Sequence, residues 1–471
     1  METQKGFVSF VGAGPGDTGL VTKKGLQCLK EADVILYDRL ANPRLLRYAK
    51  ENCHFIYCGK LPERHTMRQE KINKLLIQYA NDGCYVVRLK GGDPSVFGRV
   101  GEEAEELAAN HIAFDIIPGI TSSVAAAAYA GIPVTHRDYS TSLTLRTGHT
   151  CENNTNLHDD GQFLGDTIAY YMGMKKMLIN CRELINQGKP ADTKVAIIQW
   201  GTLGKQKVVE GTLETIQATI ENERIQSPAM MIVGEVVGLR EKLSWFDKKK
   251  FSGRKMLIAK ASGSPFTLEE YFTEHGAEAY SFPVLKQKVY SFTKEALKTI
   301  IQGDRLVFTD SASVDILFHQ FSQAQYDIRD LPRSIKYQTE KTRKALAARG
   351  IIATKAQNVD ASSIVIGSKI DLNHAKESYR THEWQVDERF DEINARMLAE
   401  DDWETVIFPN KAAVTSFTNE IKKLGMQHLL DIKFAYMGES VKEYAVKQGF
   451  CTVDEAVQSE LKRMNWRDEH V

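Results

Sequence analysis

Short apolar segments rich in β-branched and aromatic residues alternate with amphipathic segments along the first half of the chain. The segments with the composition of buried strands are residues 7–11, 33–37, 54–60 and 85–89. Between them, residues 20–32 and 67–80 are predicted helices, and Ile72 and Leu76 lie on one face of the second helix. Strands that alternate with helices in this way predict an α/β fold.

The most distinctive turn in the sequence is residues 88–103, RLKGGDPSVFGRVGEE. An apolar strand precedes it and a helix with acidic residues in its first turn follows it, so the glycines lie where α/β sheets bind ligands. Gly91 and Gly92 allow backbone N–H groups to approach a bound molecule, while Val96 and Phe97 supply an apolar surface. A ligand with a polar end and a flat aromatic end would fit, and a connecting turn without a ligand is the alternative.

Other strand ends carry glycine or charged residues. Residues 12–17, GAGPGD, resemble a dinucleotide fingerprint, but Pro15 interrupts the turn and no acidic residue ends a second strand at the usual distance. A Rossmann NAD site is therefore the weaker interpretation. Asp38 and Arg39 end the second strand and Lys60 lies just beyond the third, on the expected ligand side of the sheet.

The rest of the first half repeats this pattern of glycine beside a strand end. Thr121 and Ser122 are predicted to cap a helix of small residues. His136 and Arg137 form a local basic cluster with Asp138. The further glycine-containing turns are RTGH at 146–149, YYMG at 170–173 and WGT at 200–202.

The charged segment 247–253 is the best candidate for a linker, because the strand and helix pattern restarts after it. Residues 303–318 and 401–417 are two similar strand-turn-helix units, about 100 residues apart, which indicates an internal duplication. The predicted domains are therefore residues 1–246 and 254–471.

Composition limits the function classes. A chain of 471 residues is long enough for two or three domains. The 61 basic and 61 acidic residues give no net charge, so no global field favours nucleic acid or an anionic membrane. An anionic substrate must then be bound by a local cluster of cations.

The cysteines indicate a reducing compartment. There are 7 of them, scattered and odd in number, as expected of reduced thiols in the cytosol. Cys53 and Cys58 have no second pair that would complete a zinc site. We find no segment with the form of a signal peptide, and the apolar run 124–134 is too short to span a bilayer. We expect a cytoplasmic protein.

Taken together, the motifs of the first half resemble those of the uroporphyrinogen-III C-methyltransferases in order and spacing from residue 6 to residue 246. They are GAGPGD, YDRL, GK, RLKGGDPSVFGRVGEE, PGITS, AGIPVTHRDY, TGH, YMG and SPAMMIVGEVV. The resemblance implies a two-lobed α/β fold, a homodimer, and S-adenosylmethionine bound between the lobes. It also implies two successive methylations of uroporphyrinogen III to precorrin-2, for sirohaem or cobalamin.

The resemblance also assigns roles to residues. Asp38 matches the family's proton acceptor and Lys60 its proton donor. The positions that match its cofactor contacts are Pro15, Gly91, Gly92, Asp93, Val96, Thr121, Ser122, Met172 and Gly201. Candidate cations for the substrate carboxylates are Arg39, Arg99, His136 and Arg137, together with Arg146, where the family usually has an apolar residue. A sulfonium donor needs no metal.

The second half resembles uroporphyrinogen-III synthase less closely. The segment SYRTHEW matches the tyrosine motif at the crossing between that enzyme's lobes, and Tyr379 is the candidate catalytic residue. We expect one lobe from residues 254–284 and 383–471, and a second from residues 285–382. Asp310 replaces a serine at a turn that should hold a substrate carboxylate, which predicts weak ring closure. Alternatively, Asp310 only caps the helix that follows.

Two other functions are considered. The first half is also compatible with a methyltransferase for another tetrapyrrole, such as a precorrin-4 type, although YDRL, THRDY and the complete GGDPSVFGR turn argue against it. The second half is also compatible with a non-catalytic binding or assembly module. Asp310 favours this alternative, as does Val441, which stands where the synthase family has a threonine.

Overall fold

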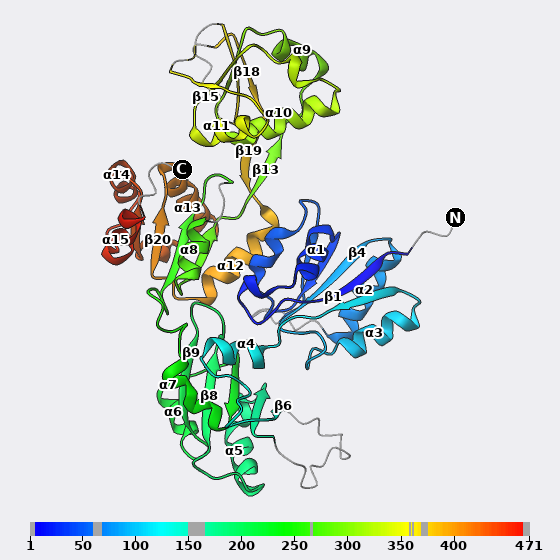
Figure 1. Ribbon diagram of the computed structural model, residues 1–471, viewed down its shortest axis with the longest axis vertical. Helices are drawn as coiled ribbons and strands as arrows, with labels where there is room; N and C mark the ends of the chain where they lie inside the picture. Colours follow the sequence, from blue (N-terminus) through cyan, green and yellow to red (C-terminus); the bar gives the residue numbers. More distant parts are fainter. Residues whose placement is uncertain are drawn as a thin grey trace. The chain divides into compact units, whose positions relative to one another are not determined.

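The computed structural model describes residues 5–59, 68–148, 165–263, 267–357, 359, 362–368 and 375–464. Contacts divide the chain into two compact units, Met1–Met256 with Thr267–Tyr280, and Leu257–Phe266 with Ser281–Val471 (Figure 1). Each is described by itself. The predicted boundary at residues 246 and 254 falls near this division, but residues 267–280 join the first unit.

A five-stranded parallel sheet with the order β3-β2-β4-β1-β5 begins the first unit. Its strands are β1 (Phe7–Gly12), β2 (Val34–Tyr37), β3 (His54–Tyr57), β4 (Tyr85–Lys90) and β5 (Ala113–Ile117). The helices between them are α1 (Lys23–Glu31), α2 (Gln69–Asn81) and α3 (Val100–Ala109). Leu76 and Leu107 pack on Phe10 and Val86 in the core. Because the strands are parallel, all their carboxyl ends lie at one edge.

A second five-stranded sheet follows, with the order β6-β7-β10-β8-β9. Its strands are β6 (Leu143–Thr147), β7 (Thr167–Tyr171), β8 (Lys194–Gln199), β9 (Lys207–Thr212) and β10 (Ala229–Val233). Only the β6–β7 pair is parallel. The helices are α4 (Ser122–Tyr129), α5 (Met177–Asn186), α6 (Ile216–Asn222) and α7 (Arg240–Leu243). Ala126 and Ala127 of α4 share one buried cluster with Ala169 and Ala196 of the sheet, so small residues line this side of the helix.

The segment predicted as a linker is packed. Phe251 is buried and its ring lies 5.2 Å from that of Phe272, in helix α8 (Thr267–Glu274). Two buried ion pairs join the same region to the 3-10 helix Pro43–Tyr48, which lies between β2 and β3: Arg44 Nη2 lies 2.7 Å from Glu278 Oε1, and Arg47 Nη1 lies 2.9 Å from Glu269 Oε2. The charge-rich sequence at 247–253 therefore does not act as a free tether.

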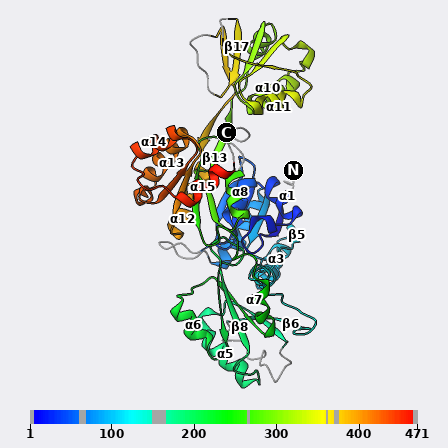
Figure 2. The same cartoon turned by 60° about the vertical axis from the view of Figure 1, so that its left-hand side comes forward.

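The second unit contains two sheets joined by the antiparallel pair β13 (Leu285–Val289) and β19 (His382–Val386) (Figures 1 and 2). One sheet has the order β16-β15-β14-β17-β18. Its strands are β14 (Arg305–Phe308), β15 (Ser334–Tyr337), β16 (Thr354–Lys355), β17 (Ser363–Gly367) and β18 (Glu377–Arg380), with helices α9 (Lys294–Ile301), α10 (Ser311–Gln323) and α11 (Glu340–Ala347).

The other sheet has the order β12-β11-β20-β21. Its strands are β11 (Lys255–Ala259), β12 (Glu278–Phe282), β20 (Thr405–Phe408) and β21 (Lys433–Tyr436), and the helices that follow β19 are α12 (Asp391–Glu400), α13 (Lys411–Lys423), α14 (Glu439–Lys447) and α15 (Glu455–Arg463). The chain leaves this sheet at β13 and returns at β19, as the predicted two-lobed arrangement requires.

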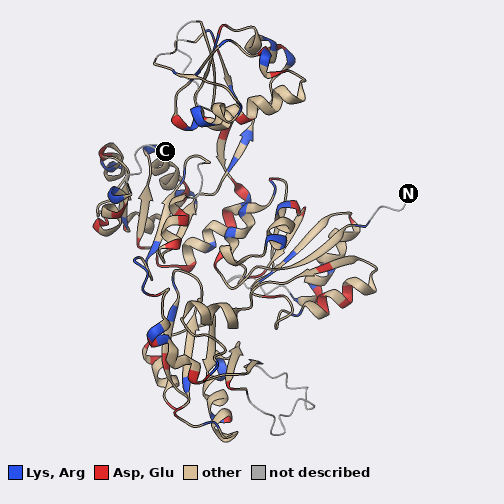
Figure 3. Ribbon diagram, in the orientation of Figure 1, with Lys and Arg blue, Asp and Glu red and all other residues tan. Residues whose placement is uncertain are grey.

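Acidic and basic residues are interspersed on the helices of both units (Figure 3), in line with a net charge of zero. Within the described ranges, none of the helices has the length and apolarity needed to cross a bilayer.

Candidate functional site

Three glycine turns meet at the carboxyl edge of the first sheet. Gly92 N donates to Gly14 O at 2.7 Å, and Gly14 N donates to Gly92 O at 3.1 Å. A Cβ on Gly12 would lie 2.5 Å from Gly119 N, a distance that backbone atoms cannot accommodate. The turns after β1, β4 and β5 therefore pack backbone against backbone, which only glycine permits.

Asp93 fixes two of these turns. Its Oδ2 accepts from Gly119 N at 3.0 Å, and its Oδ1 accepts from Ser95 N at 2.7 Å. The Asp93 carboxylate, which was predicted to contact a cofactor, thus links the glycine turns after β4 and β5. We call the glycines of these turns and of the turn after β1, Gly12, Gly14, Gly92 and Gly119, the cradle.

Backbone strain gathers at the same edge. Among the residues that the structure describes, eight non-glycine residues have positive φ, and five of them lie in turns of the two sheets at this site: Phe97, Arg99, Met172, Trp200 and Thr202. Such conformations are costly and tend to persist at ligand sites. Phe97 is 41% exposed and Met172 is 52% exposed, so two apolar side chains are open to solvent beside the glycines. The sequence assigned no role to Trp200 or Thr202, because the family resemblance assigned a cofactor contact in that turn to Gly201 alone.

Turns of the second sheet adjoin those of the first. The Tyr171 hydroxyl at the end of β7 lies 2.5 Å from Thr121 Oγ1, and its ring lies 4.9 Å from that of Phe97. Asp17 N donates to Thr202 Oγ1 at 3.0 Å. The structure therefore brings together turns of both sheets that carry predicted cofactor residues.

The predicted cap at Thr121 needs correction, and the glycine at position 201 has a structural reason. Thr121 is the N-cap residue of α4, but its side chain makes no capping hydrogen bond, because its hydroxyl pairs with Tyr171. Gly201 is explained by packing, since a Cβ there would lie 2.4 Å from Ala126 Cβ. Pro15, Val96 and Ser122 lie in or directly after the same glycine turns.

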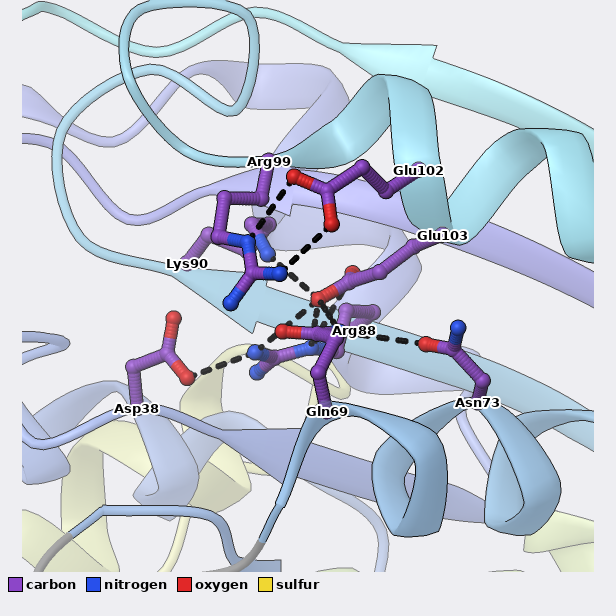
Figure 4. Close-up of polar contacts among 8 residues, drawn as sticks. All are labelled: Asp38, Gln69, Asn73, Arg88, Lys90, Arg99, Glu102 and Glu103. Carbon is purple, nitrogen blue, oxygen red and sulfur yellow. Dashed lines mark hydrogen bonds and ion pairs between the residues drawn. The ribbon is translucent and has the colours of Figure 1, made fainter. Parts of the chain in front are cut away.

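Asp38 lies at the end of β2 above a buried group of charges (Figure 4). Its Oδ1 lies 2.6 Å from Arg88 Nη2, and Arg88 Nε lies 3.3 Å from Glu103 Oε2. Lys90 Nζ donates to Glu103 Oε1 at 2.8 Å, and Gln69 Nε2 donates to the same oxygen at 2.9 Å. The side chains of Arg88 and Glu103 are 3% and 0% exposed, whereas that of Asp38 is 32% exposed. The Asp38 carboxylate is therefore held by Arg88 on its buried side and is open to solvent on its other side.

Burial and neighbouring charges act in opposite directions in this group. Desolvation would lower the pKa of Arg88, but the carboxylates of Asp38 and Glu103 outweigh it and raise that pKa. Desolvation and the adjacent Arg88 guanidinium lower the pKa of Lys90. Burial raises the pKa of the Cys58 thiol to about 11.

The remaining candidates for the first half differ in their surroundings. Lys60 lies outside the described residues. Arg39 and Arg137 are exposed, as expected of cations that meet a substrate. Arg99 pairs with Glu102, with Nη2 2.5 Å from Oε2, so part of its charge is already neutralised. His136 Nδ1 accepts from Asp138 N at 3.1 Å.

Arg146 departs from the family pattern and lies on β6. Its Nη1 donates to Tyr170 Oη at 3.5 Å, a contact that holds the guanidinium within the second sheet.

In the second unit, Tyr379 lies on β18. Its hydroxyl donates to Glu377, and its ring lies 5.6 Å from that of Phe292. Burial and the hydrogen bond to Glu377 raise the pKa of Tyr379.

Asp310 has two structural tasks. Its Oδ1 accepts from Ser313 N at 2.8 Å and caps α10, while its Oδ2 accepts from Ser368 N at 2.9 Å. Burial would raise the pKa of Asp310, but the hydrogen bonds from Ser313 and Ser368 outweigh it and lower that pKa. Asp310 therefore caps α10, as the alternative predicted, but it does not only cap that helix, because the same carboxylate also accepts from Ser368 N at the end of β17.

Within the described ranges, no group of three or more His, Cys, Asp and Glu side chains is placed to hold a metal ion.

Comparison with known proteins shows which family the chain resembles. The profile of the tetrapyrrole (corrin/porphyrin) methylases matches residues 8–217. A uroporphyrinogen-III C-methyltransferase of Bacillus subtilis is 40% identical over 434 residues, 90% of this chain and 90% of its own length. One from Priestia megaterium is 53% identical over 49% of this chain and 98% of its own length.

A solved structure of the Thermus thermophilus uroporphyrin-III C-methyltransferase, complexed with S-adenyl homocysteine, is 35% identical, with a TM-score of 0.43. It covers 50% of this chain and 100% of its own. The predicted enzyme class is confirmed by the full-length similarity to the Bacillus relative. The chain belongs to the uroporphyrinogen-III C-methyltransferase family.

Proposed function

We propose that this protein transfers methyl groups from S-adenosylmethionine to two carbons of uroporphyrinogen III, giving precorrin-2. The observation that carries the proposal is the backbone cradle of Gly12, Gly14, Gly92 and Gly119, which lies beside an anchored carboxylate, Asp38, in a chain of this family. Both features lie at the carboxyl edge of one parallel sheet.

The residues present fit such a cofactor. A Cβ added to Gly92 would have its nearest neighbours 3.8 and 3.9 Å away, so the cradle has an open side. The exposed side chains of Phe97 and Met172, in turns of the same site, suit an apolar part of the cofactor. When bound, S-adenosylmethionine supplies an electrophilic methyl group on a sulfonium.

The protein's own residues then bind, orient and move protons. We assign cofactor contacts to the predicted positions: Pro15, Gly91, Gly92, Asp93, Val96, Thr121, Ser122, Met172 and Gly201. Asp38 accepts a proton from the substrate, because its carboxylate is open on one side and held on the other. Lys60 is proposed as the proton donor from the family match alone.

The substrate carries several carboxylates and needs local cations in a protein without net charge. We assign that role to Arg39, Arg99, His136 and Arg137. Arg39 and Arg137 support this best, since both are exposed. A homodimer through the methyltransferase half, a cytoplasmic location, and the absence of nucleic-acid or membrane partners are parts of the same proposal.

For the second half we propose a retained two-lobed synthase-like fold with little ring-closing activity. Asp310 supports this because its carboxylate already accepts from Ser368 N and Ser313 N, groups that a substrate carboxylate would need. A binding or assembly role for this half is the second candidate, and the same observation favours it.

The experiment uses the full chain, because Arg44 and Arg47 pair with Glu278 and Glu269 beyond the methyltransferase half. Uroporphyrinogen III, precorrin-2 and a precorrin-4 type substrate are offered in competition with S-adenosylmethionine, and products are resolved by mass. Preferential dimethylation of uroporphyrinogen III supports the proposal. Methylation of another tetrapyrrole while uroporphyrinogen III is left unchanged would overturn it.

A further inference from the structure

The carboxylate of Asp38 is held by a buried charge cluster, which we define as Arg88, Lys90 and Glu103. Arg88 and Lys90 are two residues apart on β4, so strand geometry places both on one face. Glu103 projects from the first turn of α3 onto that face and meets both cations. Figure 4 shows Arg88 lying between Asp38 and Glu103.

Burying the charged side chains of this cluster costs desolvation free energy, so stability alone does not explain the arrangement. The side chains of Arg88, Lys90 and Glu103 are 3%, 4% and 0% exposed, so all three charges have lost their water. Buried ion pairs are often no more stabilising than apolar residues of the same volume. The one carboxylate in contact with the cluster that remains open to solvent is Asp38, among the residues that the structure describes.

We propose that Arg88 and Glu103 are positioning residues for Asp38. Arg88 holds the Asp38 carboxylate in one orientation, and Glu103 in turn holds the Arg88 guanidinium and offsets its charge. The proposal rests on the proposed role of Asp38 in proton transfer.

The charged neighbours of Asp38 define what each substitution changes. From β4 come Arg88 and Lys90, and from α3 comes Glu103. Cys58, at the end of β3, is a neutral thiol at neutral pH, since burial raises its pKa to about 11. Gln69 of α2 is neutral and donates to Glu103. Lys60 lies outside the described residues and is left unchanged in every variant.

The test is the pH profile of kcat for two single variants of the full chain. Arg88→Gln removes a cation 2.6 Å from the Asp38 carboxylate. Loss of a neighbouring cation favours the neutral form of a carboxylate, so the low-pH limb should move to higher pH. Glu103→Gln removes an anion and leaves Arg88 and Lys90 uncompensated, so the limb should move to lower pH, by a smaller amount.

Two further variants separate positioning from folding. Arg88→Lys keeps the charge but loses the planar fork, so it should retain the pH profile with a lower kcat. The double variant Arg88→Gln with Glu103→Gln removes one charge of each sign, so its limb should lie between those of the single variants. Thermal melting and calorimetry with S-adenosylhomocysteine establish that each variant is folded. If Arg88→Gln does not fold, the pH profiles of Glu103→Gln and of the double variant decide the result.

Shifts of opposite sign support the proposal. Unshifted profiles, or shifts of one sign in both single variants, would overturn it, because a purely structural cluster predicts loss of rate without opposite displacement. Asp38→Asn distinguishes this from a failure of the proposed function. An Asp38→Asn variant with full activity refutes the role of Asp38 itself, whereas an inactive one leaves the cluster proposal to stand or fall on the profiles.

Discussion

The hydroxyl oxygens of Tyr171 and Thr121 lie 2.5 Å apart and join the end of β7 to the start of α4. Tyr171 also donates to Ser123 Oγ at 2.7 Å, and its ring packs on Phe97. One side chain thus connects the glycine turn of the first sheet, the helix that leaves it and the YMG turn of the second.

Tyr171→Phe should weaken cofactor binding while preserving the contact with Phe97. Loss of a hydrogen bond worth about 0.5–1.5 kcal/mol corresponds to about a 2- to 12-fold rise in the Kd for S-adenosylhomocysteine. Calorimetry measures this, and Tyr139→Phe, at an exposed tyrosine elsewhere in the same unit, is the control. Equal affinities for Tyr171→Phe and the wild type would refute a role for this hydroxyl.

Gly92→Val should abolish cofactor binding. The backbone of Gly92 has a φ of +69°, which a β-branched residue adopts only at considerable cost, and its side chain would project into the open side of the cradle. Gly101→Ala is the matched control, because a Cβ there meets nothing within 4 Å and alanine favours the helix. Retained binding in Gly92→Val would show that the cradle is not the cofactor site.

Asp38→Ala and Lys60→Ala should lower kcat with little change in cofactor affinity, because neither residue belongs to the glycine turns. A positioned acid or base contributes about 100- to 10,000-fold to rate, which sets the expected loss. Parallel rate measurements and calorimetry with S-adenosylhomocysteine give the two quantities. A loss of affinity equal to that of Gly92→Val would contradict the division of roles.

Arg44→Met should destabilise the protein strongly. It leaves Glu278, which is buried, without its partner at 2.7 Å, and breaking such a buried pair costs about 3–5 kcal/mol. Denaturant unfolding of the full chain measures the change. Arg343→Met, which breaks the half-exposed pair with Glu340, should change the free energy of unfolding by less than about 1 kcal/mol. Equal losses of unfolding free energy in both variants would show that the buried pair stabilises the protein no more than the exposed one.

Asp310→Ser should raise the ring-closing activity of the second half from a low level. Serine still caps α10, so the fold is kept, but Ser368 N becomes available to a substrate carboxylate. The ratio of type III to type I uroporphyrin formed from hydroxymethylbilane measures the effect. A wild-type protein that is already an efficient synthase, and is not improved by the substitution, would contradict the account.

Local patterns were sufficient to predict the first four strands, the glycine turns and the α/β class. The boundaries moved by a few residues: the helix predicted at residues 20–32 is α1, Lys23–Glu31, preceded by a short 3-10 turn at Thr18–Leu20. Gly12 and Gly119 are far apart in sequence, so their need for glycine follows only from the contact between two turns.

Pairings between distant side chains could not be predicted. Glu103 looked like an ordinary acidic residue in the first turn of a helix, and its partnership with Arg88 depends on how α3 packs on β4. The segment 247–253 has the composition of a linker, yet Phe251 finds a partner in Phe272, and nothing local to either residue shows this. Thr121 is a residue type that commonly caps a helix, but its hydroxyl pairs with Tyr171 of the second sheet instead.

The most direct test of the proposed function is the mass of the product formed by the full chain from uroporphyrinogen III and S-adenosylmethionine with a deuterated methyl group. The account predicts a product that carries two labelled methyl groups, and none when Gly92→Val replaces the wild type. A product without label from the folded wild-type protein would contradict the assignment.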